Sequence, residues 1–399
     1  MKKITLINSP REIYEEGRAD TYLGIDNSYP VGLLLISSSI KNSGYHEVDY
    51  LDANFYHKDP DSILSHIKDV DPDYIGMNIA FPNLFVVESI VDMIKQYYPD
   101  KKIIVGGPAS TLAAEHILSN SSADCAILGE GEETIVELLD MFDREEDLAG
   151  IEGIAYIGAD GSPVRNRRRI PMPIGDVPFI DVDNIPKEIK DAGEITLFSS
   201  RGCDSNCNFC STPSIWGRGK KNIRNSSVGR IFQEIQNYID YGYNFNFIRF
   251  MDDSFTNDWE RVDEFIGKWN QTYGKEGKTW GCLSRVKAIN SSSKVEKMAD
   301  SGCVKVSVGV ESASQKILKS IGKGITTEEV DRFLEYCSRH SIRKNGFFMM
   351  GFPRETEEDV MKTIEYISSR PFDDVAISIV VAYPGTKLYR NVYGKEKLV

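Results

Sequence analysis

The sequence contains no run of about 18 consecutive uncharged apolar residues, which is the length that a membrane-spanning helix requires. Its beginning, Met1 to Pro10, has an apolar stretch that is too short for a signal peptide and leads directly into a strand-like run. We therefore expect a cytoplasmic protein that has no membrane partner.

Positive charge is also scarce, since 47 Lys and Arg residues face 60 Asp and Glu residues, for a formal net charge of −13. A nucleic-acid partner is not expected, because the dominant phosphate interaction needs a basic surface. The dense basic run from Arg165 to Arg169 is interpreted as a solvated hairpin edge. The 7 cysteines are an odd number in a chain without a secretory signal, which argues against a disulfide framework.

A dinucleotide fingerprint, Gly-x-Gly-x-x-Gly, is absent after the first predicted strand. Otherwise the 399 residues, 41% hydrophobic and 27% charged, are typical of a soluble globular protein with two domains. Short apolar runs alternate with amphipathic helical patterns over residues 1–145, which predicts an α/β domain with a doubly wound, parallel, Rossmann-like sheet. The predicted strands are 3–8, 48–51, 74–79, 102–105 and 125–128, and the predicted helices include 31–43, 63–70, 85–98 and 132–139.

The remainder divides into a linker and a second domain. Residues 146–194 contain a β-hairpin signal around Asp160-Gly161 and then a Pro-rich extended stretch, so they are expected to form a linker. Residues 195–399 contain six strand-helix units with polar or glycine residues at each strand end. This pattern predicts a partial (β/α)6 barrel whose site lies at the carboxyl ends of its strands.

Three of the cysteines stand on one short loop, Cys203, Cys207 and Cys210, in a Cys-x3-Cys-x2-Cys pattern. Three thiolates can hold a metal centre and leave one coordination position open, as chemistry at a metal requires. We interpret the loop as the seat of a 4Fe–4S cluster. A zinc knuckle with a distant fourth ligand and a chance cluster are the alternatives. The other four cysteines, in strand-like or helix-like contexts, are expected to be buried structural thiols.

With an aromatic residue just before its third cysteine, this loop resembles that of the radical S-adenosylmethionine (SAM) enzymes. The resemblance implies a cluster on the three cysteines whose fourth iron binds SAM, and an electron donor such as flavodoxin or ferredoxin. It also implies that cleavage of SAM releases a 5′-deoxyadenosyl radical. The residues implied to contact SAM are Phe209 near the adenine, Asp252 or Asp253 at the amino group, Arg285 at the carboxylate, Glu311 and Ser312 at the ribose, and Gly351 in the adenine-lining strand end. An acid/base pair formed by Asp252 and Asp253 is a weaker alternative.

A second resemblance covers most of residues 1–145, which are similar to the cobalamin-binding domain that precedes a radical SAM domain in one large subfamily. The motif that supplies a histidine to cobalt, Asp-x-His-x-x-Gly, is altered, because Asn54 stands in the place of the histidine. The resemblance therefore implies that cobalamin binds without a histidine from this domain, or that the domain is empty. The candidate contacts are Asn54, Gly106, Gly107, Gly129, Glu130 and Gly131; the glycines alone could equally make tight turns.

Together these features favour a cobalamin-dependent radical SAM methyltransferase that acts on an unactivated carbon atom. One alternative is a radical SAM reaction without methyl transfer, such as a deoxygenation, rearrangement or cyclisation. Another is a metal-binding or electron-carrying module without catalysis, but such a module needs no SAM-suited residues at its strand ends. The expected substrate is an unidentified small molecule or a carrier-bound or peptide-bound intermediate.

Overall fold

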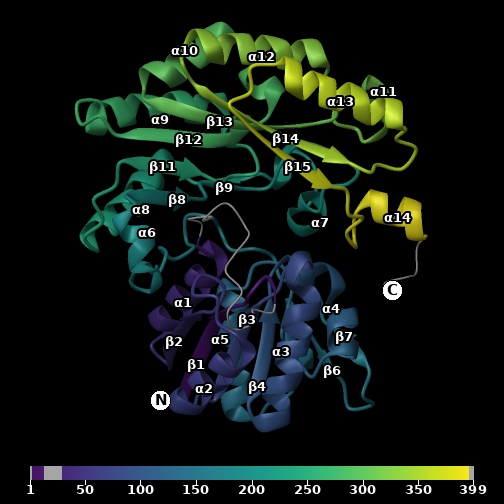
Figure 1. The fold of residues 1–399 in the computed structure, drawn as a ribbon. Helices are drawn as coiled ribbons and strands as arrows, with labels where there is room; N and C mark the ends of the chain where they lie inside the picture. Colours follow the sequence, from purple (N-terminus) through teal and green to yellow (C-terminus); the bar gives the residue numbers. More distant parts are fainter. Residues whose placement is uncertain (1, 13–28, 395–399) are drawn as a thin grey trace. The chain divides into compact units, whose positions relative to one another are not determined.

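The computed structural model describes residues 2–12 and 29–394 of the chain (Figure 1). The chain forms two compact units, and the division between them falls between Ile189 and Lys190. This position lies inside the stretch 146–194 that the sequence predicts as a linker. Each unit has its own sheet.

The first unit is built on a seven-stranded sheet in the order β2-β1-β3-β4-β5-β6-β7. Strands β1 to β5 pair in parallel, and β6 and β7 extend the sheet as antiparallel strands. The predicted parallel sheet is confirmed, and the predicted hairpin of the linker forms its last two strands. The strands are β1 (Lys2–Asn8), β2 (His46–Asp52), β3 (Tyr74–Asn78), β4 (Lys102–Gly106), β5 (Cys125–Ile127), β6 (Ile154–Ile157) and β7 (Pro163–Arg165).

Helices cover both faces of this sheet, which explains why the middle of its central strands is mostly apolar. One core lies under α2, α3 and α4, and a second core lies under α1 and α5 on the opposite face. The helices are α1 (Val31–Ser43), α2 (Pro60–Val70), α3 (Leu84–Tyr97), α4 (Pro108–Asn120) and α5 (Glu132–Arg144), with a short α6 (Lys187–Asp191) at the division between the units.

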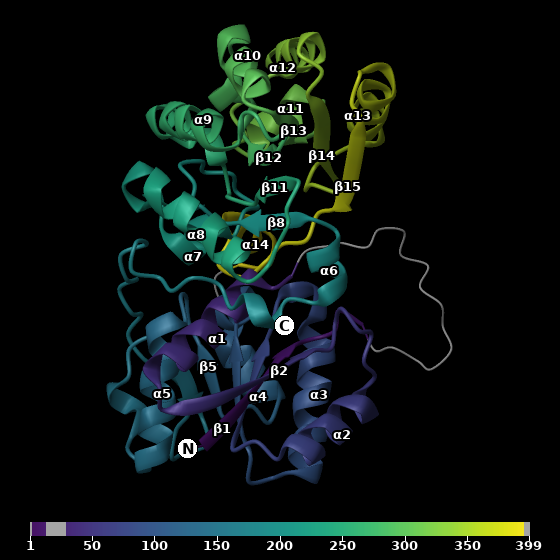
Figure 2. The same ribbon diagram turned by 90° about the vertical axis from the view of Figure 1, so that its left-hand side faces the viewer.

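The second unit contains a six-stranded, all-parallel sheet in the order β15-β14-β13-β12-β11-β8. Figure 2 shows this sheet with its longer helices on one side, as in half of a βα barrel. The predicted six-unit partial barrel is therefore confirmed. Its strands are β8 (Glu194–Leu197), β11 (Phe247–Phe250), β12 (Thr279–Ser284), β13 (Cys303–Glu311), β14 (Arg343–Met350) and β15 (Asp374–Ile379).

Most helices of the second unit begin at side-chain caps that the sequence supplies, and α7 and α11 are the exceptions. Thr326 and Glu329 form a capping box at the start of α12, and Thr356 and Asp359 form another at the start of α13. The helices are α7 (Thr212–Trp216), α8 (Val228–Asp240), α9 (Trp259–Tyr273), α10 (Ser292–Asp300), α11 (Gln315–Ser320), α12 (Thr327–Arg339), α13 (Glu357–Ser369) and α14 (Lys387–Tyr393).

Some short elements were not predicted from the sequence. The two-residue strands β9 (Ser200–Arg201) and β10 (Arg224–Asn225) form a separate antiparallel pair next to the three-cysteine loop. Helices α7, α11 and α14 are also absent from the predicted elements. In the described part of the chain, no helix is long and apolar enough to cross a membrane.

Candidate functional site

The carboxyl ends of the six parallel strands in the second unit carry nearly all of the SAM-site residues predicted from the sequence. Because the strands are parallel, these ends share one edge of the sheet, which we call the mouth. The residues at or just beyond the strand ends are Asp252 and Asp253 after β11, Arg285 after β12, Glu311 and Ser312 at the end of β13, and Gly351 after β14. The three-cysteine loop follows β8 and β9 at the same edge.

Two strand ends and a hairpin position the start of the cysteine loop. Arg201 pairs with Arg224 across β9 and β10. Gly202 has a φ of +99°, and a Cβ built there would lie 2.7 Å from the carbonyl oxygen of Asn222. Only glycine fits both the positive φ and this close approach of two backbones. The Gly202 amide also donates to Asp253 at 3.2 Å, which ties the loop to the end of β11.

The far half of the cysteine loop is held through Asn208. Its amide nitrogen donates to the Ile321 carbonyl at 2.9 Å, and its side chain donates to the Ser320 carbonyl at 3.0 Å. Its own carbonyl accepts from the Leu388 amide of α14 at 2.8 Å. The loop is therefore fixed by segments that lie more than a hundred residues along the chain from it.

The three loop thiols are half-buried, whereas Cys125, Cys282, Cys303 and Cys337 are buried, as predicted. Burial raises the pKa of Cys207 and of Cys210, and the neighbouring thiols contribute in the same direction. In the residues that the structure describes, no group of three or more His, Cys, Asp or Glu side chains is arranged to hold a single metal ion. The donor set itself, three thiols on one anchored loop at the mouth, fits an iron–sulfur cluster.

Asp252 and Asp253 are adjacent but lie in different environments. Asp252 is fully buried, accepts hydrogen bonds from the amides of Ser199 and Ser200 at 2.6 and 2.7 Å, and lies 3.9 Å from the buried guanidinium of Arg261. Its burial raises its pKa, although these partners oppose the shift. Asp253 is exposed and accepts from Thr212 at 3.0 Å. The structure therefore leaves Asp253, not Asp252, accessible at the mouth, and it does not form a shared acid/base pair.

Arg285 forms an ion pair with Asp204, which directly follows the first cysteine of the loop. Their side chains are 26% and 24% exposed, so the pair stays open to a ligand. Asp204 was not singled out from the sequence. The only signal was its place inside the cysteine loop.

Glu311 is buried and has an unusual backbone, with a φ of +72°. Such a conformation is uncommon for residues other than glycine and is found most often at functional sites. Its carboxylate lies 2.7 Å from the ammonium of Lys323, whose side chain is 14% exposed. Lys323 was missed from the sequence, where the available signal was its place between Gly322 and Gly324, both of positive φ.

The remaining predicted SAM contacts differ in their accessibility. Ser312 is fully buried, and its hydroxyl lies 3.2 Å from that of Thr363 and accepts from the Ser314 amide. The hydroxyl of Ser312 is therefore enclosed, although its backbone stands beside Glu311 at the mouth. Phe209 packs edge-on against Phe352, with ring centroids 5.7 Å apart. Gly351, with a φ of +95°, is exposed next to that aromatic pair.

In the first unit, a row of polar side chains lies at the carboxyl ends of β2, β1 and β3. Asn8 donates to Asp52 at 2.7 Å, and Asn78 donates to Asn8 at 3.0 Å. Asn54 follows in the turn after β2, where its side chain accepts from the Arg11 amide at 3.2 Å. This row spans the switch point between β1 and β3, where ligands bind in sheets of this order.

The predicted glycines lie at the same edge of the sheet, at the ends of β4 and β5. The structural reason for a glycine differs from one position to the next. Gly107 and Gly129 have positive φ, and a Cβ at Gly131 would lie 2.9 Å from Ile36. Gly106 has neither constraint, because a Cβ built there meets only Ile127 at 4.0 Å. The fold therefore does not require glycine at 106, because a Cβ there would make only an ordinary contact. Glu130 is half-buried between Gly129 and Gly131.

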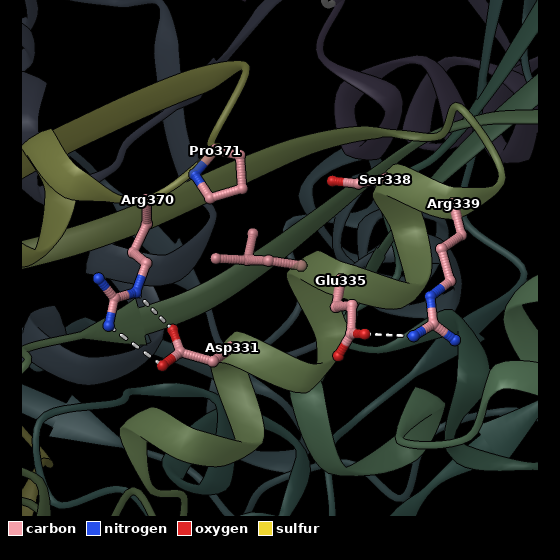
Figure 3. Close-up of a pocket in the computed structure, with 7 residues that line it drawn as sticks. Asp331, Glu335, Ser338, Arg339, Arg370 and Pro371 are labelled. Atoms are coloured by element: carbon pink, nitrogen blue, oxygen red, sulfur yellow. Dashed lines mark hydrogen bonds and ion pairs between the residues drawn. The ribbon is translucent and has the colours of Figure 1, made fainter.

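A groove on the second unit lies elsewhere (Figure 3). Two ion pairs line it, Asp331 with Arg370 at 2.8 Å and Glu335 with Arg339. Arg370 stands four residues before Asp374, the first residue of β15, and so lies near the amino ends of the strands, away from the mouth. The charges of this groove already pair with one another, and it contains none of the predicted site residues.

In the comparison with known proteins, each unit matches the model of a protein family. A model of the B12 binding domain matches residues 26–139, and a model of the Radical SAM superfamily matches residues 197–367. The uncharacterized methyltransferase PH0819 of Pyrococcus horikoshii is 31% identical over 379 residues, which cover 93% of this chain and 80% of that protein.

Two solved structures are similar in fold. The radical SAM methyltransferase TsrM from Kitasatospora setae, with cobalamin and a [4Fe-4S] cluster bound, gives a TM-score of 0.77 at 17% identity, over 98% of this chain and 75% of that one. The cobalamin-dependent radical SAM enzyme OxsB, with aqua-cobalamin and SAM bound, gives 0.74 at 20% identity over 94% of this chain. The chain spans about half, 53%, of the length of OxsB.

Proposed function

Since the chain belongs to the radical SAM superfamily, in the group whose radical SAM domain follows a B12-binding domain, we propose that it is a methyltransferase that acts on an unactivated carbon atom. The observation that carries the proposal is the presence of both cofactor domains in one chain, with a three-thiol loop at the mouth of the second. A reducing, cytoplasmic compartment suits this proposal, because every described cysteine is free.

The chain's own residues then have distinct tasks. Cys203, Cys207 and Cys210 hold the 4Fe–4S cluster. Asp253 accepts the ammonium group of SAM, because a carboxylate and an ammonium form a charge-assisted hydrogen bond. Arg285 turns from Asp204 to the carboxylate of SAM, and Glu311 accepts from the ribose hydroxyls. The chemistry available from the bound groups is one-electron cleavage of SAM and transfer of a methyl group by way of cobalt.

Lys323 has a positioning task in this proposal. Its ion pair fixes the carboxylate of Glu311, whose strained backbone would otherwise relax. In the first unit, Asn54, the Gly106-Gly107 turn and the Gly129-Glu130-Gly131 turn border the space for the corrin ring. None of these residues is a histidine. The position of Asn54 therefore provides no imidazole ligand to cobalt.

The test uses protein reconstituted anaerobically with iron, sulfide and cobalamin, then given SAM with a deuterated methyl group and a chemical reductant. We expect two products from SAM. 5′-Deoxyadenosine reports radical formation, and S-adenosylhomocysteine reports loss of the methyl group. The Cys207→Ser variant should form less than about one hundredth of the 5′-deoxyadenosine, while Cys337→Ser, at a buried cysteine elsewhere, should retain it.

The outcomes separate the proposal from its alternatives. 5′-Deoxyadenosine without S-adenosylhomocysteine would favour a radical reaction without methyl transfer. Failure to form 5′-deoxyadenosine in cluster-loaded protein would contradict the radical SAM activity itself.

A further inference from the structure

A long segment of this acidic chain carries basic residues and no acidic ones. Between Asp204 and Glu234 there is no Asp or Glu, while the same stretch contains five cationic residues. They are Arg218, Lys220, Lys221, Arg224 and Arg230. In a chain with a net charge of −13, this stretch is a local reversal of sign. It also contains two of the three loop cysteines.

The basic residues are joined directly to the cysteine loop. Arg224 pairs with Arg201 in the β9–β10 ladder, and Asn222 contacts the backbone of Gly202, the residue before Cys203. Arg201 in turn lies over the ring of Trp216, with 5.8 Å from its guanidinium carbon to the ring centroid. The segment from 216 to 225 is the arm that returns to β10 in the β9–β10 hairpin, and it packs against the start of the cysteine loop; we call this arm the basic hairpin.

The tip of this hairpin is open to solvent. Arg218, Lys220 and Lys221 are exposed, and within the described residues the structure gives their side chains no ion-pair partner. Exposed unpaired cations next to one another repel, so the arrangement costs stability unless an anionic partner binds there. Such a patch also raises the rate at which an acidic macromolecule meets this surface.

We propose that the basic hairpin, residues 216–225, is the docking surface for an acidic one-electron carrier protein. This inference rests on the proposed function, because the electron is needed only if the cysteine loop holds a cluster. In the step, one electron leaves the reduced carrier, which is oxidised by one electron, and the cluster is reduced by one electron. No bond or proton moves. The hairpin suits this partner because it is the basic surface in direct backbone contact with the loop that receives the electron.

The test reverses two exposed charges in the Lys220→Glu, Lys221→Glu double variant. The matched control, Lys275→Glu with Arg332→Glu, reverses two exposed charges on the loop before β12 and on α12. Each protein is loaded with cluster and SAM. Electrons come either from a reduced acidic flavodoxin or from reduced methyl viologen, a small cationic reductant, and the initial rate of 5′-deoxyadenosine formation is measured at low and high salt.

With flavodoxin at low salt, the hairpin variant should be at least about tenfold slower than the parent and the control. This difference should shrink at high salt, because exposed charges are screened. With methyl viologen all three proteins should react equally. If viologen also gives no product in the parent, the proposed function fails, whatever the role of the hairpin.

Three results would overturn the docking proposal while leaving the radical activity intact. An equal loss of rate with both reductants would assign the hairpin to the cluster or to SAM. An unchanged rate with flavodoxin would place the docking surface elsewhere. Retention of a single-stranded RNA by the parent but not by the hairpin variant, without an effect on flavodoxin, would assign the patch to a nucleic acid.

Discussion

At the scale of single residues, the adjacent carboxylates Asp252 and Asp253 differ in their surroundings, and we expect them to differ in their roles. Asp252 is enclosed by the amides of Ser199 and Ser200 and by Arg261, so its charge is compensated inside the unit. Asp253 shares the same turn but faces outward. The sequence presents them as equivalent, because adjacent acidic residues after a strand carry no sign of which one is enclosed.

Exchanging each carboxylate for an amide should therefore give opposite phenotypes. Asp252→Asn should lower the free energy of unfolding by about 3 kcal/mol, because it removes the fully buried counter-charge of Arg261 and leaves only Asp258 near that guanidinium. Asp253→Asn should keep that stability but weaken SAM binding about tenfold, roughly 1.4 kcal/mol. Urea denaturation and equilibrium dialysis with labelled SAM measure the two effects. Equal loss of SAM binding in folded Asp252→Asn would refute the assignment.

A second residue, Glu88, makes the stability of the first unit depend on pH. It is buried on α3, its carboxylate lies 3.6 Å from His116, and Asp92 is also nearby. Burial, reinforced by Asp92, raises the pKa of Glu88 from 4.5 to about 7. Folding therefore favours the protonated acid, and this contribution is complete below about pH 4.5 and is lost as the pH rises through 7.

Glu88→Gln should remove this dependence and raise the free energy of unfolding at pH 8 by roughly 2 kcal/mol. Chemical denaturation between pH 5 and pH 8 measures it, with the exposed Glu133→Gln as the control. A variant that keeps the same slope against pH as the parent would show that Glu88 is not the titrating group.

At the scale of elements, the end of β4 shows how a strand terminus serves both fold and ligand. Gly107 has a φ of +116°, and a Cβ there would lie 2.7 Å from the carbonyl oxygen of Ile79. Gly106, one residue earlier, has ordinary strand geometry and open space around it. The turn thus needs one of its two glycines, and the other preserves a gap.

Gly106→Val should accordingly leave the thermal midpoint nearly unchanged, because valine favours strands and its Cβ would make only an ordinary contact, with Ile127 at 4.0 Å. It should weaken cobalamin binding at least tenfold, about 1.4 kcal/mol, by filling the gap. Gly107→Val should destabilise the unit through its strained φ. Calorimetry and the visible absorbance of bound corrinoid measure these effects. Unaltered cobalamin affinity in Gly106→Val would move the corrin away from this strand end.

At the scale of the whole molecule, the two units have separate sheets, and each matches the model of a different cofactor-binding family. The cysteine loop is anchored by residues of the second unit, and the glycine turns lie in the first. Loading of one cofactor should therefore not require the other.

The triple variant Cys203→Ala, Cys207→Ala, Cys210→Ala should lose bound iron yet bind cobalamin within about twofold of the parent. Gly106→Val should show the converse, full iron content with little cobalamin. Iron analysis and corrinoid absorbance on the same preparations measure the iron content and the cobalamin content. Joint loss of both cofactors in either variant would show that the two sites depend on each other.

The sequence by itself determined the two α/β units, the parallel sheets and the cysteine loop. Periodic apolar runs specify strands and helices locally, and thiolate spacing on a single loop is a local property. It missed β9, β10 and α14, because two-residue ladders and short helices form only when distant segments support them, as Leu388 does for Asn208.

Only the tertiary structure decided which residues at each strand end are accessible. It enclosed Asp252 and Ser312, left Asp253 open, and brought Lys323 to Glu311 and Asp204 to Arg285. It also placed the basic hairpin against the cysteine loop. Burial and pairing depend on contacts between segments far apart in the chain, so no local pattern could have specified them.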